Sequence, residues 1–255
     1  MSNVERLAAL VTTFVVSLAI GLLVDPPWNW ALLGVTMLLV CLGAEQIVYA
    51  NWRVKARRRR YAVTAWTLPA LATVTAFLFL RLPIFYSGIG MGLGLAAAAV
   101  LLAVIVIAQY RSLDPADPFY RHSRMALSLV VYLIALGSYS AIYAPKARSL
   151  LSATAVLAVS TVFALEVLRS EEGLPRRTAL CAVVVGVVLG QITWALNYWV
   201  VNALAGGAIL LLAFYVLAGL AQSHLTGELS RRVAVEFGVV AAFSICLVLV
   251  SLVAV

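Results

Sequence analysis

Apolar runs of about 20 residues recur along the whole chain, and this is the length that an α-helix needs to cross a bilayer. A transmembrane β-barrel would instead alternate apolar and polar residues within segments of about ten residues. Charged residues make up 11% of the chain, against about 25% in soluble domains, so water is not the expected solvent. The sequence therefore predicts an all-α, polytopic transmembrane helix bundle that forms a single integral membrane domain over residues 1–255.

Nine spans are expected from the apolar runs and from the charged or turn-forming segments between them. The predicted helices cover residues 7–24, 30–49, 61–80, 87–110, 125–143, 149–168, 175–196, 203–222 and 233–255. The first run is taken as a retained helix, because no small-x-small signal-peptide cleavage site follows it. Pro69 lies inside the third helix, where we expect it to kink the helix and to leave a carbonyl oxygen for a neighbouring helix to bind.

A dense basic cluster lies between the second and third runs, at residues 51–61. Its six cations are Arg53, Lys55, Arg57, Arg58, Arg59 and Arg60, and such a cluster beside an apolar run holds a loop in the cytoplasm. Alternation of nine spans from this loop places the N-terminus in the cytoplasm and the C-terminus outside. All 18 lysines and arginines then lie inside except Arg81, Lys146 and Arg148, in agreement with the positive-inside rule.

This asymmetry accounts for the net charge of +8 without a nucleic-acid partner. We expect a multi-pass protein of a bacterial-type plasma (inner) membrane, whose partners are the lipid bilayer and, in one alternative, other membrane subunits. The same topology places tryptophans and tyrosines at both interfaces. The outer ones are Trp28, Trp30, Trp194, Tyr198 and Trp199, and the inner ones are Trp52, Tyr61 and Trp66.

Small residues spaced by four predict close contacts between helices. Two such pairs occur, Gly90 with Gly94 and Gly186 with Gly190.

Three carboxylates fall within predicted spans, where charged groups are costly and mark functional sites. They are Glu45, Glu166 and Glu236, all near the predicted cytoplasmic helix ends. If the helices converge, the three form a polar site that holds a cation, relays a proton or pairs with a cationic substrate group. The alternative is ordinary ion pairing at the interface. Arg169 follows Glu166 at i+3 and Arg232 precedes Glu236 at i−4, whereas no cation lies one turn from Glu45.

A second polar set lies near the predicted outer face and consists of Gln191, Thr193, Asn197 and Asn202. Gln191 and Asn197 are the secondary site candidates. The alternative is that the whole set satisfies the turn between the seventh and eighth helices.

Several chemistries are excluded by residue types that the predicted spans lack. His122 and His224 fall in predicted cytoplasmic loops, which excludes a bis-histidine haem, and the lysines also fall in loops, which excludes a retinal-type Schiff base. No paired-aspartate motif, Walker loop or Ser–His pattern occurs. We therefore predict no catalytic residue, no metal and no cofactor, and an enzyme is not favoured.

The segment Glu171-Glu172-Gly173-Leu174-Pro175-Arg176 is similar to the Glu-Glu-x-x-x-Arg signature of CPBP-type intramembrane proteases. Thr226-Gly227-Glu228-Leu229, followed by Glu236, looks like that family's later stretch. The resemblance covers roughly the last third of the chain and implies metal-assisted hydrolysis. Asn197 and Glu236 stand where the family has histidines, so ligands that the metal needs are missing. Pro175 also favours a loop or a helix start around the glutamate pair.

Three functions follow in order of preference. The first is transport, permeation or small-ligand binding through the polar site near the cytoplasmic side. The second is a structural or scaffold subunit of a membrane complex, and the third is a membrane-embedded hydrolase-like protein with a degenerate CPBP-type site. A polar cavity that reaches the carboxylates would favour transport or ligand binding. Stability that depends on a partner would favour the scaffold function. Ligands clustered around a metal or water would favour the hydrolase-like function.

Overall fold

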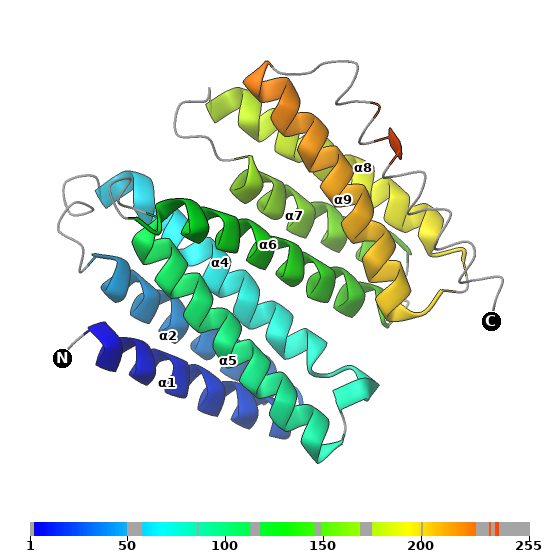
Figure 1. Cartoon of the computed structure of the whole chain (residues 1–255). Coiled ribbons are helices and arrows are strands. Elements are labelled where there is room, and N and C mark those ends of the chain that lie inside the picture. The colour runs from blue at the N-terminus through cyan, green and yellow to red at the C-terminus, as the bar shows by residue number, and fades with distance from the viewer. Residues whose placement is uncertain are drawn as a thin grey trace. The chain divides into compact units, whose positions relative to one another are not determined.

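A computed structural model describes residues 3–49, 58–85, 87–112, 118–145, 149–168, 175–199, 201–227, 235 and 238–239. Over this part the chain is all-helical, with eight α-helices and the short 3-10 helix η1 (Pro83–Phe85) (Figure 1). The α-helices are α1 (Asn3–Leu23), α2 (Trp28–Tyr49), α4 (Arg58–Phe79), α5 (Gly88–Arg111), α6 (Tyr120–Tyr143), α7 (Ser149–Val167), α8 (Pro175–Leu196) and α9 (Ala203–Thr226).

The helical prediction is confirmed, and the differences lie at helix ends. The helix predicted to begin at residue 125 begins at Tyr120, and the helix predicted to end at residue 222 ends at Thr226. The predicted loop positions of His122 and His224 are therefore wrong, because the helical backbone continues beyond the apolar run into polar residues. Gly227 ends α9 with φ +74°, a left-handed conformation that glycine adopts at little cost. The predicted helix 233–255 lies almost wholly outside the described residues.

Seven of the described helices are long and apolar enough to cross a membrane, namely α1, α2, α5, α6, α7, α8 and α9. The described apolar part of α4, Trp66–Phe79, is shorter. Large apolar side chains such as Leu23, Ile89 and Leu150 are exposed, which suits contact with lipid. The chain is a membrane-spanning helical protein.

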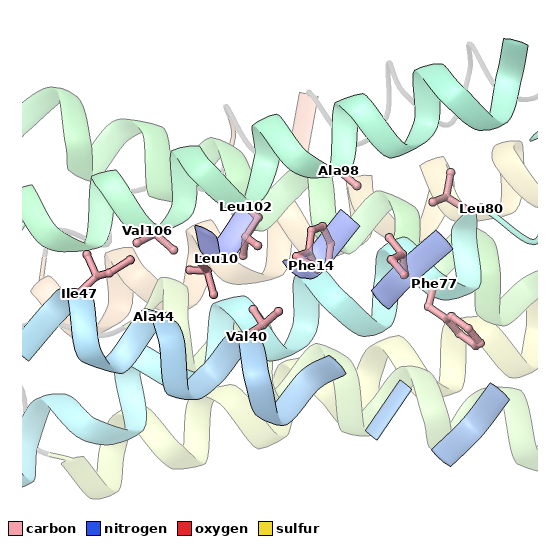
Figure 2. Close-up of a cluster of buried hydrophobic side chains, with 11 residues drawn as sticks. Leu10, Phe14, Val40, Ala44, Ile47, Phe77, Leu80, Ala98, Leu102 and Val106 are labelled. Atoms are coloured by element: carbon pink, nitrogen blue, oxygen red, sulfur yellow. The ribbon is translucent and has the colours of Figure 1, made fainter. Parts of the chain in front are cut away.

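Two compact units make up the chain, Met1–Ile134 and Ala135–Val255. In the first unit, α1, α2, α4 and α5 pack around one hydrophobic cluster, and the side chains of these four helices point toward one another (Figure 2). Its buried members are Leu10, Phe14, Leu18, Val40, Ala44, Ile47, Phe77, Leu80, Ala98, Leu102 and Val106. On each helix these residues recur every three or four positions, which is the spacing of one helical face.

In the second unit, α7 and α8 form the closest helix pair. A Cβ atom added to Gly186 would lie 2.7 Å from the carbonyl oxygen of Leu157, and one added to Gly190 would lie 3.1 Å from that of Ala153. The predicted helix contact of Gly186 and Gly190 is confirmed, because only a glycine lets the two backbones approach this closely.

Three buried aromatic rings, Tyr139, Phe163 and Phe214, connect α6, α7 and α9 within the second unit. Their centroids lie 6.2 to 6.3 Å apart in edge-to-face arrangements, the geometry that aromatic pairs prefer. The Tyr139 hydroxyl is 2.9 Å from Ser160 Oγ, so the polar end of this ring is also satisfied.

Candidate functional site

Glu45 of α2 and Trp66 of α4 are joined by a hydrogen bond in the first unit. The indole Nε1–H of Trp66 donates to Oε2 of Glu45 at 2.9 Å. Glu45 is half-buried and Trp66 is 37% exposed, so the bond lies at the edge of the helix pair and not in its core. A bond to an ionised acceptor is stronger than one between neutral groups, and it fixes the position of the carboxylate.

Cys41 supports the same contact one helical turn earlier on α2. Its thiol donates to the backbone carbonyl oxygen of Trp66 at 3.7 Å. Cys41 and Glu45 are four residues apart and share a face of α2, so α2 holds Trp66 at both its backbone and its side chain. Cys41 and its neighbour Ala44 are buried.

The carbonyl that Cys41 binds is not the one that Pro69 of α4 leaves without a partner. A proline lacks the N–H that would bind the carbonyl four residues earlier, and we expected a neighbouring helix to bind that carbonyl. The thiol of Cys41 instead binds the carbonyl of Trp66, one residue closer to the proline. In the next turn, the Thr73 hydroxyl donates to the carbonyl of Pro69 at 2.8 Å.

The Trp66 bond orients the Glu45 carboxylate without neutralising it, because the indole is uncharged. Among the side chains that the structure describes, no cation pairs with Glu45 and no donor other than Trp66 binds it. The carboxylate thus has acceptor capacity at Oε1 for a cation, a proton or a ligand. The basic residues of 51–61 that precede α4 or begin it are outside the described side chains.

Of the other two predicted carboxylates, one belongs to the second unit and one lies outside the described residues. Glu166 is half-buried on α7 and belongs to the second unit, where it has an interaction partner. Glu236 lies outside the described residues. The convergence of the three carboxylates therefore stays a prediction.

The secondary polar candidates lie on α8 and directly after it. Asn197 is half-buried, and its Nδ2 donates to Ser152 Oγ of α7 at 2.7 Å. Gln191 is exposed. Asn202 caps α9 by accepting a hydrogen bond from the backbone N–H of Ala205 at 2.7 Å. Asn197 and Asn202 thus have structural contacts of the kind that the alternative interpretation expects.

Comparison with known proteins gives a family. Residues 9–251 match the family model described as protein of unknown function (DUF5656). The chain belongs to the DUF5656 family. No curated protein and no solved structure matches it.

Several polar residues of this DUF5656 protein are buried at positions that the sequence patterns did not single out. The hydroxyl of Tyr143 donates to the carbonyl oxygens of Leu196 at 2.9 Å and Trp199 at 3.3 Å. Asn29, one residue before the predicted start of the second helix, is the second residue of α2 and is fully buried. Its side-chain amide has no hydrogen-bond partner among the described residues, and neither does the buried Ser140 hydroxyl.

The residues that carry the CPBP resemblance are described only in part. Glu171, Glu172, Glu228 and Glu236 lie outside the described residues, and Arg176 is exposed at the start of α8. In the described part of the chain, no three His, Cys, Asp or Glu side chains gather as a metal site.

Proposed function

We propose that this DUF5656 protein binds or conducts a proton or a small cation through Glu45. The proposal includes the finer topology expected from the sequence, with nine spans in a bacterial-type plasma membrane, the N-terminus in the cytoplasm and the C-terminus outside. It treats residues 1–255 as one integral membrane domain. Glu45 then lies near the cytoplasmic end of α2.

The observation that carries the proposal is the hydrogen bond from Trp66 Nε1 to Glu45 Oε2 at 2.9 Å. A carboxylate within a membrane span is costly unless it is paired or hydrogen-bonded, and the indole supplies one donor but no charge. The remaining negative charge calls for a positive ligand. Glu166 and Glu236 are proposed as further carboxylates on the same path, and Gln191 and Asn197 as secondary polar residues.

Ion flux into vesicles tests this function. The full chain is reconstituted into vesicles that contain a pH-sensitive dye or a sodium-sensitive dye, and entry is driven by an imposed membrane potential. Glu45→Gln keeps an acceptor for Trp66 but removes the charge, so we expect flux to fall strongly, because intramembrane ionisable residues mark ion and proton pathways. Asp25→Asn is the matched control, because Asp25 is an exposed carboxylate between α1 and α2.

Equal flux through wild type and Glu45→Gln, at equal protein content, would reject Glu45 as the site. If the wild type carries neither ion, conduction of protons and of sodium is rejected. The scaffold function would then lead, and its test is whether stability depends on another membrane subunit.

A further inference from the structure

Arg81 caps one end of the hydrophobic cluster of the first unit. Its guanidinium carbon lies 4.3 Å from the ring centroid of Phe77 and 6.0 Å from that of Trp30. The two rings are themselves edge-to-face at 5.9 Å. Phe77 is a buried member of the cluster and lies with Leu80 at one end of it (Figure 2), whereas Arg81 is half-buried and Trp30 is 54% exposed.

The contacts of Arg81 with the two rings are cation–π contacts, which use the charge of the guanidinium and none of its N–H groups as hydrogen-bond donors to another residue. A guanidinium has five N–H donors in its plane. None of them binds a residue that the structure describes, and Arg81 has no ion pair there. The last carbonyls of α4 are bound by backbone N–H groups, since Arg81 N donates to Leu78 O and Leu82 N to Phe79 O, so the side chain does not cap the helix.

Two features indicate the depth in the membrane at which the N–H donors of Arg81 lie. Trp28 and Trp30 at the start of α2 are 72% and 54% exposed, and exposed tryptophans at helix ends lie at the level of the lipid headgroups. An arginine at the same level extends its charged end toward the headgroups. The N–H donors of Arg81 therefore lie at the depth where phospholipid phosphates are concentrated.

We propose that Arg81, Phe77 and Trp30 form a binding site for the phosphate group of a phospholipid. A planar guanidinium matches two phosphate oxygens, and the contacts with Phe77 and Trp30 hold the Arg81 guanidinium in place before the lipid binds. The phosphate supplies an anionic partner for Arg81, which has no ion pair among the described residues. The site is independent of Glu45 and of any ion flux.

Lipid binding to the purified full chain tests this site. Protein in a phosphate-free maltoside detergent is titrated with dioleoyl phosphatidylglycerol, and bound lipid is counted by native mass spectrometry. Arg81→Gln should weaken binding roughly tenfold, as expected for the loss of a charge-assisted hydrogen-bonding group. Arg6→Gln is the control, because Arg6 is an exposed arginine on α1 of the same unit and loses the same charge. It should bind as the wild type does.

Two further ligands separate a lipid site from a general anion site. Dioleoylglycerol has the same acyl chains without phosphate, so its binding should be the same for wild type and Arg81→Gln. Inorganic phosphate at the same concentration should not displace phosphatidylglycerol. Equal binding by Arg81→Gln and wild type, or an equal loss in Arg6→Gln, would overturn the site. Displacement by inorganic phosphate would overturn its assignment to lipid.

Arg81→Lys keeps the proposal testable if Arg81→Gln does not fold. Lysine retains the cation over Phe77 but lacks the planar pair of donors. Binding weaker than wild type supports the site, and unchanged binding contradicts it.

Discussion

The hydroxyl of Tyr143, near the end of α6, donates to the backbone carbonyl of Leu196 at the end of α8, at 2.9 Å. The bond joins residues 53 positions apart, and the same carbonyl also accepts a hydrogen bond from the backbone N–H of Trp199 at 3.0 Å. Tyr143 is also buried, so its hydroxyl connects α6 to the end of α8 away from water.

Tyr143→Phe should lower the free energy of unfolding by about 0.5–1.5 kcal/mol, the net contribution of one hydrogen bond, because Leu196 O keeps its bond to the N–H of Trp199. The measurement is SDS-induced unfolding in detergent micelles. Tyr198→Phe removes the same hydroxyl from a side chain that is 76% exposed and should change the value little. Equal effects of the two changes would mean that the Tyr143 bond adds no stability.

Two glycine-to-alanine changes should have opposite signs. Gly186→Ala places a methyl group against Leu157 O and the Thr161 hydroxyl, so we expect a loss of about 1–3 kcal/mol from overpacking. Gly92 of α5 has no atom within 4 Å of an added Cβ, and Gly92→Ala should add about 0.5–1 kcal/mol through the higher helix propensity of alanine. Both changes are measured by SDS unfolding, and stabilisation by Gly186→Ala would refute the close contact.

The buried amide of Asn29 should make replacement by an apolar residue favourable. Neither polar atom of this side chain has a hydrogen-bond partner among the described residues, so Asn29→Leu should raise the unfolding free energy by about 1 kcal/mol by removing the cost of a buried polar group. Asn202→Ala is the contrasting variant, because it removes the N-cap of α9 and should cost about 1 kcal/mol. A marked loss with Asn29→Leu would indicate that the amide binds a water or ligand.

A double-mutant cycle tests the energy of the Glu45–Trp66 bond. Trp66→Phe removes the donor and Glu45→Ala removes the acceptor, and the free energies of unfolding of both single variants and the double variant are compared. We expect a coupling energy of about 1.5–3 kcal/mol, as for other hydrogen bonds to charged groups. Strictly additive effects would show that the two side chains do not stabilise each other.

Sequence patterns predicted the helices well because each one coincides with an apolar run. The errors came where a helix extends beyond its apolar run. Residues 120–124 are polar yet helical, because a helix that spans a membrane can continue into the headgroup region, where hydropathy carries no information on backbone conformation. The helix predicted to begin at residue 30 begins at Trp28, so Asn29 belongs to α2.

Of the two residues of the candidate site, only the charged one, Glu45, could be predicted from the sequence. Glu45 could be selected because a carboxylate in an apolar run is rare. Trp66 carried a stronger competing interpretation as an interface tryptophan, and its bond to Glu45 depends on how α2 and α4 are aligned. That alignment is set by packing between residues 21 positions apart, for which a single sequence has no local signal.

The close contact between α7 and α8 also has a consequence for how this protein is assembled in the cell. At Gly186 and Gly190 the glycine Cα–H groups face carbonyl oxygens of α7, and such weak Cα–H···O contacts, together with close van der Waals packing, act in lipid without any help from water. These two helices follow one another in the chain, so they can associate as soon as both have left the translocon. We therefore expect α7 and α8 to enter the bilayer as a preformed hairpin, onto which the later α9 is added.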